Sequence, residues 1–219
     1  MADIIVKVLQ PASSYDLATL AEIKLMLGIQ PTDTTEDALL SMWITAYSDV
    51  IATLCRRVFA KEQVEESWRG DLMPFNTDNG RVFLTHYPVA DPDLLTVTAP
   101  DGSTIASTGY ELENRSGKLQ FFNAAAWSEP IRITYSGGYL LPDEAPPALK
   151  QALGLLVQNA RIWQSRALTS GVRSISHRES RVQFFDINAA VAKMHGAGPL
   201  GMANDMVTSL LSAYMRLYV

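Results

Sequence analysis

Apolar residues recur at every third or fourth position in two stretches near the N-terminus, which is the spacing of one helix face. The first stretch is residues 19–28, where Thr19 and Glu22 make a capping box and Gly28 marks the end. The second begins near Thr35 and predicts a longer helix with two arginines in its last turn. Its expected apolar face consists of Leu40, Trp43, Tyr47, Val50 or Ile51, and Leu54.

The helical pattern returns after Pro147, a residue type that suits the first turn of a helix. This third helix is predicted to extend to about Leu168, and its expected apolar face consists of Leu149, Leu153, Leu156, Ala160 and Trp163. A last helix is predicted from about Asn204 to Tyr218. We expect the helices to pack as one unit, because each presents an apolar stripe that must be buried.

Between these helical regions the pattern changes to short runs rich in β-branched and aromatic residues. The runs VEESW, RVFLTHY, LLTVTA, GYELE, KLQFF and IRITYS are separated by turn signals such as Asp78-Asn79-Gly80 and Gly137-Gly138. They predict an antiparallel meander from about residue 62 to 138, since parallel pairing would need crossover helices for which the chain has no room.

The predicted fold class is therefore α+β, a small bundle of three or four helices with an antiparallel β-meander insertion. Residues 1–61 are expected to form the N-terminal helical part, residues 62–140 the β insertion, and residues 141–219 the C-terminal helices. Residues 169–181 lack an apolar period and predict an exposed loop, which the run VQFF follows as a possible short strand. Together with the connector beyond it, this segment predicts a mobile basic loop over 169–201.

The composition is that of a globular protein, because 47% of the 219 residues are hydrophobic and 19% are charged, which excludes wholesale disorder. The single cysteine, Cys55, cannot form an internal disulfide. No apolar run approaches the ~20 residues of a membrane helix, and Asp3 stands where a signal peptide would be basic. We therefore expect a soluble protein made in a reducing cytoplasm, with no membrane partner.

Charge is distributed unevenly along the chain, although the net charge is only -5. Residues 1–149 contain 10 Lys and Arg against 20 Asp and Glu, whereas residues 150–181 contain 6 against 1. The arginines of this basic segment are Arg161, Arg166, Arg173, Arg178 and Arg181. A solvated surface explains them without any function. The functional alternatives are contact with an acidic neighbour, or contact with the phosphates of passing DNA without sequence preference.

The sequence predicts no catalytic, cofactor or metal site. GAGPLG at 196–201 matches G-x-G-x-x-G but lacks the preceding strand and the following acidic residue, so we expect a hinge there. His86, His177 and His195 share no ligand spacing with Cys55. An arginine beside Cys55 would lower the thiol pKa, so a small hydrolase or transferase using Cys55 is an alternative. Packing as a small apolar residue is the commoner role.

Four segments occur along the chain in a fixed order. They are TLAEIKLMLGI with TTEDALLSMWITAYSDVIATLCRRVF, then FLTHYPVADPDLLTVTAPDG through GYELEN, GKLQFF and IRITYSGGY, then LPDEAPPALKQALGLLVQNARIWQSR, and finally TSLLSAYMRLY. In this order they resemble the head–tail connector (adaptor) proteins of tailed bacteriophages and gene transfer agents. Each motif alone is mainly a core pattern, so the order carries the resemblance. Residues 169–205 match nothing in the family.

The resemblance implies a structural virion protein and not an enzyme. Proteins of this family form a ring, usually of twelvefold symmetry, under the portal vertex of the capsid, where they extend the DNA channel and dock the tail side. The expected partners are the portal protein, the next connector or tail protein, further copies of this chain and, without sequence choice, DNA. The expected location is the head–tail junction of a virion assembled in a bacterial cytoplasm. Another virion part, such as a tail completion protein, is the alternative.

The predicted interface consists of the five arginines and of the apolar end of the last helix: Leu210, Leu211, Tyr214, Leu217 and Tyr218. A closed ring forms when one surface patch meets a different patch on the next copy, which suits the separate acidic and basic regions. The C-terminal region of the family is implicated in gripping the portal, so the resemblance favours that role for the last helix. The alternative is that this helix completes the subunit core.

Overall fold

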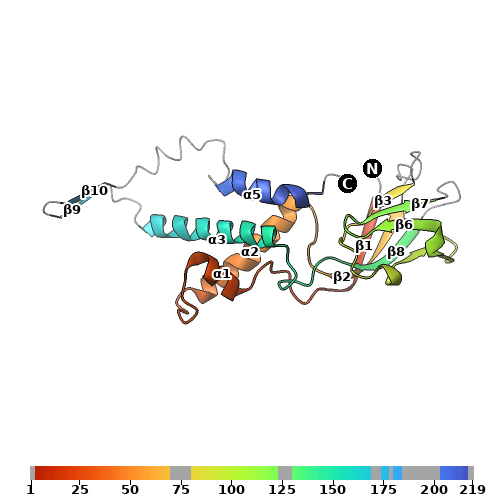
Figure 1. The fold of residues 1–219 in the computed structure, drawn as a ribbon, viewed down its shortest axis with the longest axis horizontal. Coiled ribbons are helices and arrows are strands. Elements are labelled where there is room, and N and C mark those ends of the chain that lie inside the picture. Colours follow the sequence, from red (N-terminus) through yellow and green to blue (C-terminus); the bar gives the residue numbers. More distant parts are fainter. Residues whose placement is uncertain are drawn as a thin grey trace.

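The computed structural model describes residues 3–69, 80–122, 130–168, 174–177, 180–183 and 203–216. Figure 1 shows an elongated molecule in which four labelled helices gather together, with most of the strands at one end. The helices and the strands bury separate hydrophobic cores. This combination of helices with antiparallel sheets confirms the predicted α+β fold class.

Four α-helices of the described residues form the helical unit. They are α1 (Leu20–Leu27), α2 (Asp37–Cys55), α3 (Pro147–Leu168) and α5 (Ala203–Leu211), which continues into the short 3-10 helix η4 (Ser212–Tyr214). Helix α3 packs against each of the other three helices. The capping box of Thr19 and Glu22 is present, and Gly28 ends α1 in the left-handed conformation, as predicted.

The buried faces of α2 and α3 differ in part from the predicted ones. On α2 the buried residues are Leu40, Ile44, Ser48, Ile51 and Cys55, whereas Leu54 is exposed and Trp43 and Tyr47 are partly buried. On α3 the leucines of the predicted face are buried, but Trp163 is 37% exposed. The prediction that Trp163 belongs to the core is wrong. The apolar stripe of α3 extends beyond the part of the helix on which the other described elements pack. The hydrophobic periodicity of a helix does not reveal where packing by other elements ends.

The β-strands of the insertion belong to two antiparallel sheets. The first has the strand order β1-β2-β8-β4-β5 and comprises β1 (Asp3–Gln10), β2 (Glu62–Arg69), β8 (Ile131–Gly137), β4 (Thr96–Thr98) and β5 (Thr104–Ile105). The second has the order β3-β7-β6 and comprises β3 (Arg81–Phe83), β7 (Lys118–Phe121) and β6 (Tyr110–Glu113). The pairing is antiparallel, as predicted, but neighbouring strands are often distant in sequence, so the region is more than a simple meander.

Two single-turn 3-10 helices, η1 (Pro92–Leu94) and η2 (Ser107–Gly109), connect these strands. The core between the two sheets is apolar and includes Val64, Trp68, Leu84, Val97 and Ile133, all essentially inaccessible to solvent. The helices and the strands have independent cores, since the two clusters of buried residues share no member.

Strand β1 corrects the predicted boundary of the β region. The sequence assigns residues 1–61 to the helical part, whereas β1 pairs antiparallel with β2, from Asp3 opposite Arg69 to Val8 opposite Val64. The apolar residues of β1 do not alternate with polar ones, because Ile4 stands next to another isoleucine, so the period-2 signal of a half-buried strand is weak. Two helices also separate β1 from its partner along the chain.

Strands β9 (Ser174–His177) and β10 (Ser180–Gln183) pair antiparallel as a hairpin. The predicted loop over 169–181 is therefore wrong for these strand residues. Ile175 and Val182 are the large apolar residues of the two strands, too few to give an alternation that the sequence could reveal. The rest of the predicted mobile loop over 169–201 lies outside the described residues.

Among the described residues, α2 is the one helix long and apolar enough by composition to cross a membrane. That observation is weak, because the core helix of a folded domain passes the same test. Leu40, Ile44 and Ile51 of α2 are buried in the helical core. The structure therefore gives α2 the role of a core helix.

Candidate interface surfaces and buried junctions

Arg161, the first of the predicted interface arginines, is paired within its own subunit. Its Nε donates to Oε2 of Glu36 at 2.8 Å, and its Nη2 donates to Oε1 at 3.3 Å. The two side chains are 41% and 38% exposed, so the pair contributes only ~0–1 kcal/mol to stability. Lys150, at the other end of the basic part of α3, binds Glu22 at 2.5 Å. These two cations tie α3 to the N-terminal helices.

The structure places the other predicted arginines only in part. Arg166 lies near the end of α3 and Arg181 lies in β10, but their side chains are outside the described residues. Arg173 and Arg178 are outside them altogether.

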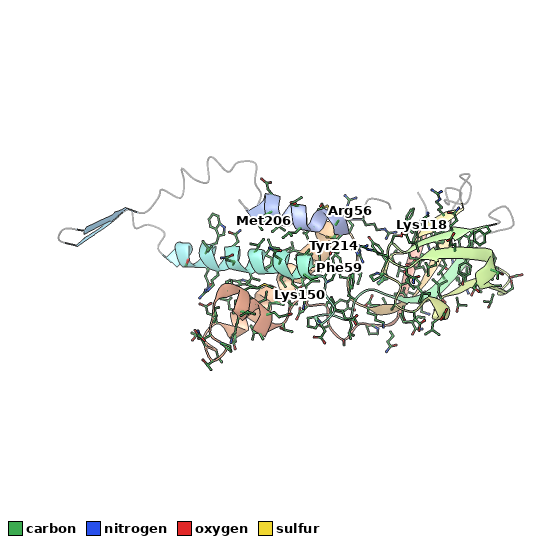
Figure 2. All side chains as sticks on the ribbon, viewed as in Figure 1. Arg56, Phe59, Lys118, Lys150, Met206 and Tyr214 are labelled. Carbon is green, nitrogen blue, oxygen red and sulfur yellow. The ribbon has the colours of Figure 1, made fainter. Side chains whose placement is uncertain are left out.

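Helix α5 packs on α3 and closes the helical core. Leu211 is fully buried, and Leu210 is partly buried against the same core. Tyr214 meets Phe59 edge-on with ring centroids 6.3 Å apart, and Figure 2 shows the two residues together at the end of the helical unit nearest the strands. Leu211 thus contributes to the subunit core. Met206 of the same helix is 51% exposed, and Leu217 and Tyr218 lie outside the described residues.

Arg57 is a buried cation at the junction between the helices and the strands. Its guanidinium lies over the ring of Tyr87, 3.5 Å from the centroid, and 4.7 Å from that of Phe59. It also donates to the backbone carbonyl of Tyr87. Burial lowers the pKa of Arg57, but a guanidinium stays charged at physiological pH. The sequence places Arg57 only in the last turn of a helix, because nothing local reveals the aromatic residues that stack on it.

A second arginine, Arg216, fixes the chain that follows η4. Its backbone N–H donates to the carbonyl of Cys55 at 2.9 Å, and its Nη2 donates to the carbonyl of Phe83 at 3.0 Å. Nearby, two segments of the chain run side by side in a parallel bridge, where the backbone N–H of Tyr139 donates to the carbonyl of Phe59 at 2.8 Å. The junction between the two units is therefore built from main-chain contacts, the buried guanidinium of Arg57 and the partly buried side chain of Arg216.

Gly138 makes that close approach possible. It has a φ of +106°, a conformation that strains any residue with a Cβ, and a Cβ added there would lie 2.3 Å from the carbonyl oxygen of Ala60. The sequence marks Gly137-Gly138 as a turn signal, whereas the structure uses Gly138 for close backbone approach.

Glu66 of β2 is completely buried and accepts hydrogen bonds from three residues. Trp68 donates through Nε1 to Oε2 at 3.0 Å, and the backbone N–H of Thr85 donates to Oε1 at 2.7 Å. The hydroxyls of Thr85 and Tyr135 donate to Oε1 as well. Burial, together with the charge of Glu66, raises the pKa of Tyr135 well above its usual range. The carboxylate is thus satisfied on all sides, which suits a structural anchor between the sheets.

Glu62, at the start of β2, connects this cluster to the segment before α1. Its side chain accepts a hydrogen bond of 2.5 Å from the hydroxyl of Tyr15, and its Oε2 lies 3.0 Å from Nε2 of His86. The hydrogen bond to Glu62 raises the pKa of Tyr15. Nδ1 of His86 lies 2.8 Å from the hydroxyl of Thr85. His86 is 3% exposed and is therefore part of a buried network.

Cys55 is fully buried at the end of α2. Burial raises the pKa of its thiol to about 11, an effect that the nearby charge of Arg57 only partly opposes. The thiol is therefore protonated at neutral pH and out of reach of a substrate. A nucleophilic role needs an accessible thiolate, so Cys55 has the packing role that the sequence favours.

Two grooves are formed by described residues. One of about 330 Å³ lies where residues 10–14 cross the start of β2 and residues 139–141. The other, of about 440 Å³, lies between the N-terminal helices and the far half of α3, beside the Arg161–Glu36 pair. Within the described part of the chain no three His, Cys, Asp or Glu side chains are arranged to hold a metal ion.

The whole fold is similar to chains in solved structures of gene transfer agent (GTA) particles. A chain from the "Neck of empty GTA particle computed with C6 symmetry" is 16% identical with a TM-score of 0.54, covering 98% of this chain and 97% of that chain. A chain from the "Virion of native gene transfer agent (GTA) particle" gives the same values. One from the "Neck of native GTA particle computed with C12 symmetry" is 14% identical with a TM-score of 0.51.

At these identities the similarity establishes a shared fold along nearly the whole chain. Neither a protein-family model nor a curated protein sequence matches the chain.

Proposed function

We propose that this chain is a structural subunit of the neck of a phage-like or GTA-like particle, where it serves as a head–tail connector (adaptor). The observation that carries the proposal is the fold similarity to neck chains over 98% of the chain. That length includes the helical unit and both sheets of the strand unit, so the likeness is not limited to one common motif. A fold alone does not define a function, and the proposal therefore needs a test in particles.

The proposed action is geometric. Copies of the chain, in a ring of twelve, meet through two different surface patches, which is the arrangement that closes a ring. One face of the ring binds the portal protein and the other binds the next connector or tail protein. The ring extends the DNA channel, and any contact with passing DNA is made to phosphates. The subunit acts at the head–tail junction of a virion assembled in the bacterial cytoplasm.

The state of Cys55 supports a structural role over catalysis. The alternative of a hydrolase or transferase depends on this residue as a nucleophile, and its thiol is both buried and held protonated. The buried carboxylates Glu62 and Glu66 are engaged with donors from the fold itself. We therefore expect particles made with Cys55→Ala to be normal.

The test compares particles from a producing cell that lacks this gene with particles from a cell that lacks the tail genes. Loss of the chain is expected to give DNA-filled heads without tails. Heads from the tail-deficient cell are expected to carry the chain as a ring at the portal vertex in electron cryomicroscopy. A chain that is absent from those heads but present on free tails would support a tail completion protein instead. A chain absent from every particle would overturn both functions.

A further inference from the structure

Strand β1 leaves one edge of the five-stranded sheet open. It stands at the end of the strand order and pairs only with β2 among the described residues. It is eight residues long, whereas the opposite edge strand, β5, has two. A long free edge presents unpaired N–H and C=O groups, which proteins usually shorten, cover or block with proline and charge.

The side chains at this edge are apolar on both faces. Val6 and Val8 lie on the core side of β1, since the β2 residues opposite them are buried, yet they are 38% and 46% exposed. On the other face Ile5 is 48% exposed, and Leu9, at the irregularity between Val8 and Gln10, is 43% exposed. Lys7 is the one charge in this part of the strand. The core of the strand unit is therefore not closed at β1 by any described residue.

The β9–β10 hairpin is a separate two-stranded sheet, whose outer strand edges have no partner strand among the described residues. Its strands have four residues each and join no other sheet, and its extensive contacts are those between its own strands. A two-stranded hairpin alone is at best marginally stable in water. Its register sets Ile175 opposite Val182, so these two residues share one face. Figure 1 shows β9 and β10 at the opposite end of the molecule from β1.

We propose that the β9–β10 hairpin of one copy adds to the β1 edge of the next copy and extends its sheet. Figure 1 places the two elements at opposite ends of one chain, and a ring requires contact between two different patches. Strand addition satisfies the free backbone groups of the edge. The face that carries Ile175 and Val182 then covers Val6 and Val8. This inference rests on the proposed ring of identical subunits.

Charge supports the same pairing. Residues 173–183 contain three arginines against one glutamate, whereas residues 62–138, which hold most of the strand unit, contain 5 Lys and Arg against 11 Asp and Glu. Opposite charge on the two surfaces favours the contact between copies and disfavours the pairing of two hairpins with each other. The association is therefore expected to weaken as salt concentration rises.

The test is cross-linking between copies with a short bismaleimide, which tolerates a shift in register. One copy carries Val6→Cys and the other carries Val182→Cys, and both are mixed as purified chains and also incorporated together into particles. We expect a mixed dimer at about tenfold or more over either variant alone, since paired strands bring opposite Cβ atoms to within ~5.5 Å. Leu94→Cys, which is 68% exposed and lies in η1 beside β8, not at the β1 edge, is the matched control and should not react with the hairpin variant.

A second pair of variants removes the contact without introducing thiols. Val6→Lys with Val8→Lys blocks the edge with exposed charges and should leave the subunit folded, as monitored by circular dichroism. Replacement of residues 174–183 by a Gly-Ser linker removes the hairpin. Each should reduce ring formation by about tenfold or more, whereas Leu94→Lys should not. Rings that form normally with both variants would overturn the inference.

The outcomes separate this inference from the proposed function. If particles contain the chain at the neck but no β1–hairpin pair cross-links, the strand addition is wrong and the neck function stands. If particles lack the chain, the neck function fails, and the cross-link between purified copies decides the inference. A mixed dimer in solution supports it, and its absence there overturns it.

Discussion

Arg216 and Phe83 are joined by a hydrogen bond of 3.0 Å from the guanidinium Nη2 to the backbone carbonyl. Through its backbone N–H, the same arginine also contacts the carbonyl of Cys55 at the end of α2. Arg216, two residues after the end of η4, is thus hydrogen-bonded both to the helical unit and to β3 of the strand unit. A partner that displaces the C-terminal segment would have to break these hydrogen bonds of Arg216. Binding of such a partner would therefore also change how the helical unit and the strand unit are held together.

Replacing Arg216 with alanine should lower the free energy of unfolding by about 1–3 kcal/mol, because the partly buried carbonyl of Phe83 loses a charged donor. Chemical denaturation of the purified chain measures the change. Arg161→Ala is the matched control, since its exposed ion pair with Glu36 should contribute less than ~1 kcal/mol. Equal losses for the two variants would contradict the structural importance of the Arg216 contact.

Replacing Glu66 with alanine should lower the free energy of unfolding by more than ~3 kcal/mol, because several buried donors lose their acceptor. Glu66→Gln should cost less, since the amide oxygen still accepts hydrogen bonds. Denaturant titrations of both variants test the ranking. Glu65→Gln, on the other face of β2 and opposite Lys7, is the control and should change stability by less than ~1 kcal/mol. A Glu66→Ala chain as stable as the control would show that the buried network is dispensable.

Local signals made part of this fold predictable. Thr19 and Glu22 define the start of α1 because both partners of a capping box lie within one turn. Pro147 opens α3 because its missing N–H costs nothing there. The alternating runs after Phe59 indicate antiparallel strands, since each half-buried strand carries its own period-2 pattern. These features depend on residues close together in sequence.

The parts that were not predictable depend on long-range partners. Arg57 becomes a buried cation because Tyr87, far along the chain, stacks on it. Glu66 becomes an anchor because Tyr135 of the neighbouring strand β8 and Thr85, which follows β3, donate to it. Strand β1 belongs to the sheet because β2, beyond two helices, pairs with it. The interface arginines Arg173 and Arg178 remain predictions, because they lie outside the described residues.

Cys55 should make stability fall at alkaline pH. Folding raises the pKa of its thiol from 9.0 to about 11, so the unfolded chain loses this proton first as pH rises. The contribution is fully present below pH 9 and is lost between pH 9 and about 11, amounting to about 2–3 kcal/mol. The free energy of unfolding of the wild-type chain should therefore fall relative to that of Cys55→Ala across this range.

A labelling experiment checks the same burial independently. The thiol of the folded chain should not react with a thiol reagent at pH 8, whereas the chain unfolded in denaturant should react completely. Rapid labelling of the folded chain, or parallel pH curves for wild type and Cys55→Ala, would mean that the thiol is accessible. Either result would reopen the possibility of a nucleophilic role.

Helix α5 is expected to serve the core with one face and a partner with the other. Leu211→Ala should lower the free energy of unfolding by about 2–5 kcal/mol, because the side chain is fully buried. Met206→Ala should change it by less than ~0.5 kcal/mol, since Met206 is 51% exposed. Chemical denaturation of the two variants gives both values.

The division between these faces also determines how a portal contact must be tested. A truncation after Gly201 removes Leu211 from the core, so a failure to assemble would be ambiguous. Met206→Glu changes only an exposed position and should leave the subunit folded. If α5 grips the portal, as the resemblance implies, heads from the tail-deficient cell should carry less of this variant than of the wild-type chain. Wild-type amounts on those heads, followed by normal tail attachment, would mean that the exposed face of α5 at Met206 does not contact the portal.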